Sequence, residues 1–223
     1  MTDIYLVRHG QASFGEKDYD NLSKLGLEQS YLLGQHFNHL NVKFDKIITG
    51  TLKRQIQTSH QIIDAANIKV QPQQTNLLNE YDVKSVLKGF VGGRDLAEPE
   101  LYDKIVHFEL LRNAVKAWTE NKIKSFLTET WEEFGIRAEK FLNLINQSIG
   151  SNCVLVVSSG GTISMILKQI LSLPSSQFLD FHFQIYNSSY SKIKISHYGM
   201  AMSLFNCIAH LESGRDFDKI SYV

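Results

Sequence analysis

Two apolar runs without polar alternation place the strongest limit on how this 223-residue chain can fold. Ile4–Val7 lies almost at the N-terminus, and Cys153–Val157 lies far along the chain. Unbroken apolar runs of this length are typical of strands buried on both faces, as in parallel sheets that helices cover on each side. Each run ends abruptly in polar residues and glycine. We therefore expect an α/β fold with both segments inside one sheet.

The first run is followed at once by Arg8, His9 and Gly10. Such residues would lie at the carboxyl edge of the sheet, where open α/β sheets bind their ligands. Arginine offers a planar fork of donors to an oxyanion, and histidine can act as a nucleophile or proton carrier. Glycine lets the backbone approach a ligand closely. Taken alone, the same three residues also fit an ordinary polar strand end.

The second run leads into Ser158–Thr162, which contains a pair of glycines, and then into a predicted helix. The apolar residues Ile163, Ile166 and Ile170 lie on one face of that helix. A strand, a glycine pair and a helix start together form an anion-binding arrangement, because the first backbone N–H groups of a helix have no partners within it.

Between the two runs, helical and strand patterns alternate at first. The expected segments are a helix over 25–40 capped by Ser23, a strand over 46–49, a helix capped by Thr51, and a short third strand over 68–71. Arg54 falls in the first turn of the second helix. A cation is disfavoured at the positive end of a helix, so Arg54 is expected either to meet an anion or simply to be solvated.

The alternation stops between Asn79 and Trp131. We expect a helical insertion over about residues 80–131 that covers one end of the sheet, either as a lid or as plain packing. A further amphipathic helix is predicted over 132–149. Ser191–Ser196 and Met202–Ile208 are then expected to form two antiparallel strands. No linker composition divides the chain, so residues 1–223 are predicted to form one domain.

Composition limits the classes of partner. Acidic and basic residues balance at 23 each, so no global charge attracts nucleic acid, and any anion site must be local. No apolar run is long enough to span a membrane, and the first strand starts too near Met1 for a signal peptide. A cytoplasmic location is therefore expected. Cys153 and Cys207 have no metal-site or redox spacing and are expected to be buried thiols.

These motifs, in this order, resemble those of the histidine phosphatase superfamily, the phosphoglycerate-mutase-like proteins. The matching segments are 8–10, 22–29, 51–58, 78–80 and 156–163, and they extend over nearly the whole chain. The resemblance implies a three-layer α/β/α sandwich with a mostly parallel sheet, an antiparallel C-terminal part and a helical insertion. It also implies a phosphoryl-transfer site at the carboxyl edge of that sheet.

One position departs from the family pattern. The family usually has a second histidine directly before the glycine pair, where this chain has Ser159. A serine can donate one hydrogen bond to a phosphate oxygen but carries no charge, and loss of one charged donor costs roughly 3–4 kcal/mol on the scale of an oxyanion donor. Activity is therefore expected to be reduced rather than abolished. The other histidines that we consider as replacements are His107, His182, His197 and His210, and for each of them a surface or packing role is the favoured interpretation.

The resemblance also implies roles for individual residues. His9 would attack phosphorus and form a phosphohistidine, with its other ring nitrogen bound to a backbone carbonyl. Glu80 would act as acid and then base, for which it needs a raised pKa, and Asp82 is the rival candidate. Arg8 and Arg54 would clamp the phosphoryl oxygens in a fork geometry.

Ser159 and the Gly160 amide would complete the phosphate cradle. Gln11 and Ser13, in the loop after the nucleophile, are candidates for contact with phosphate or substrate. Arg94 in the insertion is a further candidate, although a solvated role is the favoured interpretation for it. No metal or other cofactor is expected, because the arginines supply the positive charge.

The predicted function is phosphomonoester hydrolysis of a small phosphorylated substrate, which remains unidentified. A mutase is the first alternative. A mutase must retain and reorient a small polyanion, so several extra cations are expected around its pocket, and the insertion here is only mildly basic. A weakly active or inactive phosphate-binding relative is the second alternative, and Ser159 supports it. No nucleic-acid or membrane partner is expected, and a homo-oligomer is left open.

Overall fold

The computed structural model describes residues 1–13, 18–147, 150, 153–212 and 217–222. Its centre is a six-stranded sheet in the order β3-β2-β4-β1-β5-β6. The strands are β1 (Thr2–Arg8), β2 (Lys46–Thr49), β3 (Pro72–Gln74), β4 (Cys153–Ser158), β5 (Tyr190–Ser196) and β6 (Gly199–Cys207). The first four strands are parallel to one another, and β5 runs antiparallel to both of its neighbours, β1 and β6. The predicted α/β class, the central pair of buried strands and the antiparallel C-terminal pair are confirmed.

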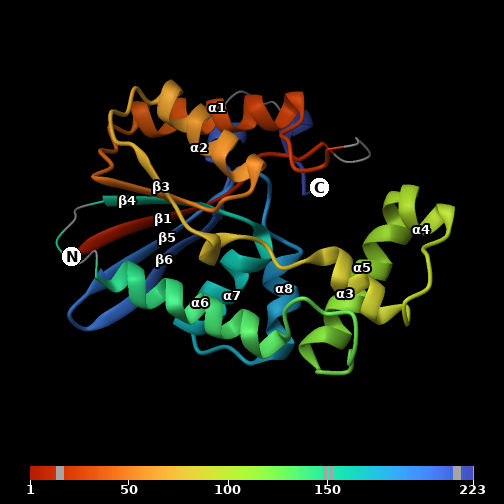
Figure 1. The fold of residues 1–223 in the computed structure, drawn as a ribbon. Coiled ribbons are helices and arrows are strands. Elements are labelled where there is room, and N and C mark those ends of the chain that lie inside the picture. Colours follow the sequence, from red (N-terminus) through yellow and green to blue (C-terminus); the bar gives the residue numbers. More distant parts are fainter. Residues whose placement is uncertain (14–17, 148–149, 151–152, 213–216, 223) are drawn as a thin grey trace.

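Strand β1 lies between two layers of helices (Figure 1), and its side chains alternate between these layers. Tyr5 and Val7 pack in the cluster that includes residues of α1 (Lys24–His39) and α2 (Lys53–Ala65). Ile4 and Leu6 pack on the other face, with residues of α6 (Trp131–Asn146) and α7 (Gly160–Ile170). Because both faces of the sheet are covered, the central strands carry continuous apolar runs.

Two predicted details are wrong. The third strand begins at Pro72 rather than within 68–71, because parallel pairing with β2 sets Ile47 opposite Pro72. Thr51 does not cap α2; its Oγ1 accepts a 2.7 Å hydrogen bond from Asn79 instead. The N-cap residue is Leu52, whose N–H donates to the side chain of Gln55 at 3.3 Å. The expected cap of α1 is confirmed, since Ser23 Oγ accepts from the Gly26 N–H at 3.0 Å.

The segment between β3 and α6 contains α3 (Val83–Phe90), α4 (Glu98–Tyr102) and α5 (Lys104–Thr119). In Figure 1 these helices lie to one side of the sheet, beyond α8 (Phe178–His182). The last short helix, α9 (Ala209–Glu212), packs on α1. The helix predicted over 132–149 corresponds to α6, and the last two residues of that prediction, 148–149, lie outside the described residues.

Both cysteines are free thiols; Cys153 is buried and Cys207 is half-buried. Across the described part of the chain, no helix combines the length and apolar character needed to cross a bilayer.

Candidate active site

The site lies where β1 and β4 end side by side. Their parallel register pairs Arg8 with Ser158, and the His9 N–H donates to the Ser158 carbonyl at 2.9 Å. His9 and Ser159 follow the paired ends of the two strands. Because side chains alternate along a strand, His9 falls on the same face as Val7, and Ser159 falls on the same face as Val157, the partner of Val7 in β4. This is the face of the sheet that α1 and α2 cover. The fold therefore brings together the two glycine-containing segments that the sequence singles out.

His9 is held as a neutral imidazole. Its Nδ1 lies 2.7 Å from the Gly10 carbonyl, which can only accept, so Nδ1 carries the proton. Nε2 therefore has the lone pair, and it accepts a 3.1 Å hydrogen bond from Arg54 Nε. The side chain is only 4% exposed. Burial, and then the positive charges of Arg54 and Arg8, hold the pKa of His9 well below its usual value.

Arg54 is fixed by an ion pair as well as by His9. Its Nη1 lies 2.6 Å from Asp20 Oδ1, and the other oxygen of Asp20 accepts from the Lys53 N–H at 2.9 Å. The Asp20 carboxylate thus sits at the N-terminal end of α2, where a negative charge is favoured. Asp20 binds Nη1 of the guanidinium, whereas His9 binds Nε, so the two partners together fix the orientation of the Arg54 side chain. Asp20 was not predicted as a site residue, because nothing in its local sequence pattern marks it.

Arg8 differs from the expected fork. Its two terminal nitrogens donate to backbone carbonyls, Nη1 to Ile185 and Nη2 to Tyr222, the latter at 2.6 Å. Its Nε is buried and has no hydrogen-bond partner among the described residues. That nitrogen faces the start of α7, since a Cβ placed on Gly160 would lie 3.5 Å from it. Arg8 thus offers the site one buried donor rather than a two-pronged clamp.

Glu80 lies against the first turn of α7. Its Oε2 accepts from the Gly161 N–H at 2.8 Å, and its Oε1 accepts from the Tyr81 N–H at 3.2 Å. Burial raises the pKa of Glu80, while the Gly161 hydrogen bond and the charge of Arg54 oppose the rise. An upward shift of the pKa is the direction that we expect for a residue that acts as acid and then as base.

Ser159 is fully buried and is the N-cap residue of α7, yet its hydroxyl makes no capping bond. Instead, Ser159 Oγ accepts a 2.8 Å hydrogen bond from Gln55 Nε2. Gln55 was not predicted as a site residue. The available signal was its position directly after Arg54, as a polar residue on a helix that packs against the sheet.

Other candidate residues are engaged elsewhere. The Asp82 carboxylate caps α3 by accepting from two backbone N–H groups of its first turn. Arg94 forms a bidentate pair with Glu100, and its side chain is 52% exposed.

The loop after the nucleophile is held by its own contacts. Gln11 Oε1 accepts from the Ser23 hydroxyl at 2.9 Å, and the Ser13 N–H donates to the Asn21 carbonyl at 2.9 Å.

His182 lies close to the site elements. Its Nε2 is 2.9 Å from the Tyr81 hydroxyl. Burial, and then the charge of Arg8, lower the pKa of His182 to about 3, while the Gly160 backbone opposes the shift. His182 is therefore neutral near pH 7. His197 is exposed on the hairpin between β5 and β6.

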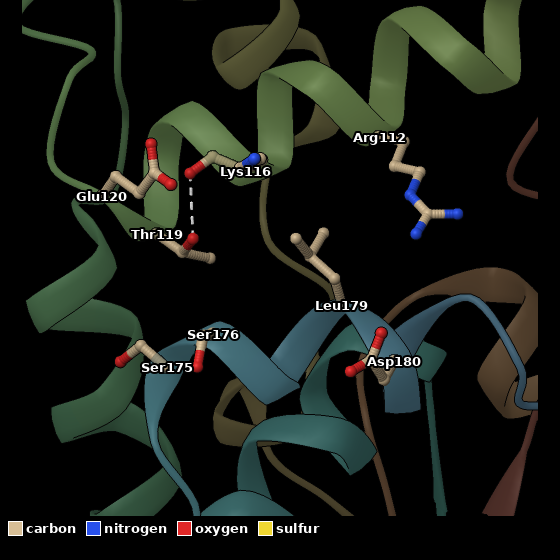
Figure 2. A pocket seen from close by; sticks show the side chains of 8 residues that line it. All are labelled: Arg112, Lys116, Thr119, Glu120, Ser175, Ser176, Leu179 and Asp180. Carbon is tan, nitrogen blue, oxygen red and sulfur yellow. Dashed lines mark hydrogen bonds between the residues drawn. The ribbon is translucent and has the colours of Figure 1, made fainter.

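A surface pocket also lies between α5 and the segment that leads into α8 (Figure 2). Figure 2 shows cationic side chains reaching from α5 and an acidic side chain on the opposite wall. The residues that line it are Arg112, Lys116, Thr119, Glu120, Ser175, Ser176, Leu179 and Asp180. None of the candidate site residues lines this pocket, and its charges are mixed, so it does not extend the anion site.

The fold is thus an α/β sandwich that gathers a neutral histidine, arginines and a half-buried carboxyl at the carboxyl edge of its parallel strands. The chain belongs to the histidine phosphatase superfamily (branch 1), whose family model matches residues 4–208. A search of curated proteins finds no match.

Several solved structures share the fold. A putative alpha-ribazole-5'-P phosphatase from Escherichia coli is 20% identical with a TM-score of 0.67, over 93% of this chain and 98% of that one. A phosphoglycerate mutase from Bacillus anthracis is 19% identical with a TM-score of 0.67, over 96% of each chain. A phosphoserine phosphatase mutant from Entamoeba histolytica, in complex with phosphoserine, is 17% identical with a TM-score of 0.59, over 95% and 100%. At these identities the likeness concerns the fold.

Proposed function

We propose that this protein hydrolyses phosphomonoesters through a phosphohistidine on His9. One observation carries the proposal: His9 is buried and neutral, with the proton on Nδ1 and the lone pair on Nε2 beside the Arg54 guanidinium. An imidazole in this state is a nucleophile that needs no deprotonation. The adjacent guanidinium is suited to stabilise the charge that develops on the transferred phosphoryl group.

The reaction has two steps. In the first, the Nε2 lone pair of His9 attacks phosphorus, the bond to the ester oxygen breaks, and protonated Glu80 gives its proton to the departing alkoxide. In the second, water attacks the phosphorus of the phosphohistidine, ionised Glu80 takes the proton of the water, and the bond to Nε2 breaks to release phosphate. The raised pKa of Glu80 suits both roles, because it lets the carboxyl hold a proton and return it.

The distribution of cations favours hydrolysis over a mutase reaction. A mutase must hold a second anionic group of its substrate while the phosphoryl group moves. Arg94, the cation of the insertion predicted as a substrate contact, is paired with Glu100, and Lys53 is paired with Asp18 at 2.5 Å. Arg8 and Arg54 therefore remain the cations that we assign to the substrate.

The proposal is tested with the full chain, a His9→Ala variant and a matched His197→Ala control. Substrates are p-nitrophenyl phosphate, phosphoserine, 3-phosphoglycerate and alpha-ribazole 5'-phosphate, the last three chosen from the names of the similar structures. We expect release of inorganic phosphate by the native chain and by the control, with a loss of at least about 10³-fold in His9→Ala. An acid-labile phosphoryl label should appear on the native protein and be absent from that variant.

Each alternative has its own outcome. Movement of the phosphoryl group within 3-phosphoglycerate without release of phosphate would indicate a mutase. Phosphate binding by calorimetry, with no turnover of any ester, would indicate a binding protein and would contradict the proposal.

A further inference from the structure

Two consecutive residues of α2 contact two side chains that lie next to one another at the end of the sheet. Arg54 donates to His9, and Gln55 donates to Ser159. Gln55 and Ser159 are both fully buried. The first turn of α2 therefore contacts the end of β1 and the end of β4 at the same time.

The hydrogen bonds of Gln55 can be assigned without ambiguity. Gln55 Nε2 lies 2.9 Å from the Leu78 carbonyl oxygen, which can only accept, so the amide nitrogen must face it. The same nitrogen lies 2.8 Å from Ser159 Oγ. Its two protons are thus used by these two acceptors, and Ser159 Oγ is the acceptor in its pair. The amide oxygen faces the Leu52 N–H.

This assignment leaves the Ser159 hydroxyl proton available. The Leu78 carbonyl already accepts from Gln55 and, at 2.7 Å, from the Ser158 hydroxyl, which fills both of its lone pairs. Among the described residues, Ser159 Oγ–H has no acceptor within hydrogen-bond distance, and Ser159 does not cap α7. A buried hydroxyl proton without an acceptor calls for a ligand atom or water beside it.

We propose that Gln55 is a positioning residue that holds the Ser159 hydroxyl as a neutral hydrogen-bond donor to an oxygen of the bound phosphoryl group. This rests on the proposed function, because it assigns a contact within the same site. At the position where the family pattern has a histidine, Ser159 supplies a neutral donor, and the hydrogen bond from Gln55 sets the direction of its O–H group. Its contribution does not depend on protonation, so it stays constant across the pH range in which a histidine would titrate.

The test is a double-mutant cycle of Gln55→Leu, Ser159→Ala and the combined variant. The readouts are the affinity for inorganic phosphate by calorimetry and kcat/KM for p-nitrophenyl phosphate. Ser159→Ala should weaken both by about tenfold, the scale of one hydrogen bond to a charged group. Gln55→Leu should weaken both by at least about fivefold. In the Ser159→Ala background, Gln55→Leu should add less than about twofold, since Gln55 then has no hydroxyl to orient.

If Gln55 only supports the fold through Leu78, Gln55→Leu should lower the phosphate affinity by the same factor in the native chain and in Ser159→Ala. The losses from the two single variants would then multiply in the combined variant, and that result would overturn the inference. Ser59→Ala is the matched control, because it removes another buried hydroxyl of α2, which donates to the Ile56 carbonyl at 2.8 Å, and leaves Ser159 and Leu78 untouched; it should change phosphate affinity by less than about twofold.

If Gln55→Leu does not fold, Gln55→Glu serves in its place. A carboxylate cannot donate to Ser159, so the serine proton should turn toward it, and Ser159→Ala should then have no further effect. Failure of this inference is separable from failure of the proposed function. If the native chain forms phosphohistidine but Ser159→Ala changes neither phosphate affinity nor kcat/KM, only this inference is wrong. If the native chain neither binds nor transfers phosphate, the proposed function is wrong as well.

Discussion

Arg54 Nε lies 3.1 Å from His9 Nε2, so the guanidinium donates a hydrogen bond to the atom that we propose as the nucleophile. Its positive charge helps to keep the imidazole neutral. For His9 to attack phosphorus, this donor must shift from the nitrogen to a phosphoryl oxygen. Asp20 holds another nitrogen of the guanidinium, Nη1, at 2.6 Å, so the group remains anchored during such a shift.

Replacing Arg54 by lysine should therefore lower kcat/KM by about 10²–10³-fold, on the scale of a lost oxyanion donor. A lysine has a single ammonium group and cannot reach Asp20, His9 and a phosphoryl oxygen through a planar fork. The measurement is steady-state hydrolysis of p-nitrophenyl phosphate. Arg112→Lys, an exposed arginine on α5, should leave kcat/KM unchanged; an equal loss in both variants would contradict the role of Arg54.

Glu80→Gln should separate the two chemical steps. The p-nitrophenolate ion is a good leaving group that needs little protonation, so the variant should still release a burst of about one equivalent from p-nitrophenyl phosphate. Without a base for water, steady-state turnover should then fall by about 10²–10⁴-fold. An alkyl ester such as phosphoserine should show no burst. Stopped-flow absorbance follows the release of p-nitrophenolate, and rapid quenching followed by amino-acid analysis follows the release of serine. A burst of the same size with both esters would argue against Glu80 as the acid.

Gly161→Ala should displace Glu80. A Cβ at Gly161 would lie 2.4 Å from Glu80 Oε1 and 2.7 Å from a ring carbon of Tyr81, well inside van der Waals contact. We expect a loss of turnover with alkyl esters of about 10²-fold or more, because the carboxyl must move, and a loss of stability of about 1–3 kcal/mol. Gly135→Ala, where the nearest atom is a Gln169 nitrogen at 3.8 Å, is the control and should be as stable as the native chain or slightly more so.

Stability should decrease as the pH falls below 6.5, in part because of His210. Burial, and then the nearby His36, lower the pKa of His210 to about 3. Below pH 6.5 the unfolded chain takes up a proton there, whereas the native chain does not until about pH 3. The stabilisation is therefore complete above pH 6.5 and is lost progressively toward pH 3.

His210→Asn should reduce the slope of unfolding free energy against pH by up to about 1.4 kcal/mol per pH unit in this window. Urea unfolding at pH 7, 6, 5 and 4 measures the slope. The exposed His197 supplies the control variant, His197→Asn, and an identical slope in all three proteins would show that His210 does not contribute.

Much of the architecture could be read from local patterns. The unbroken apolar runs predicted the central strands, because burial on both faces removes the polar alternation. Ser23 predicted the start of α1 through its side-chain acceptor. Local patterns failed where partners decide the outcome: Thr51 does not cap α2 because Asn79 binds it, and β3 starts at Pro72 because its register follows β2.

The sequence by itself determined which chemical groups the sheet edge carries, since a strand that ends in Arg8 and His9, and another that ends in Ser159, are local features of the chain. Only the tertiary structure decided how those groups are used. The terminal nitrogens of Arg8 turn to the carbonyls of residues 185 and 222, and the Ser159 hydroxyl is bound by Gln55. Hydrogen-bond direction depends on which distant atoms meet in the folded chain, and no local pattern contains that information.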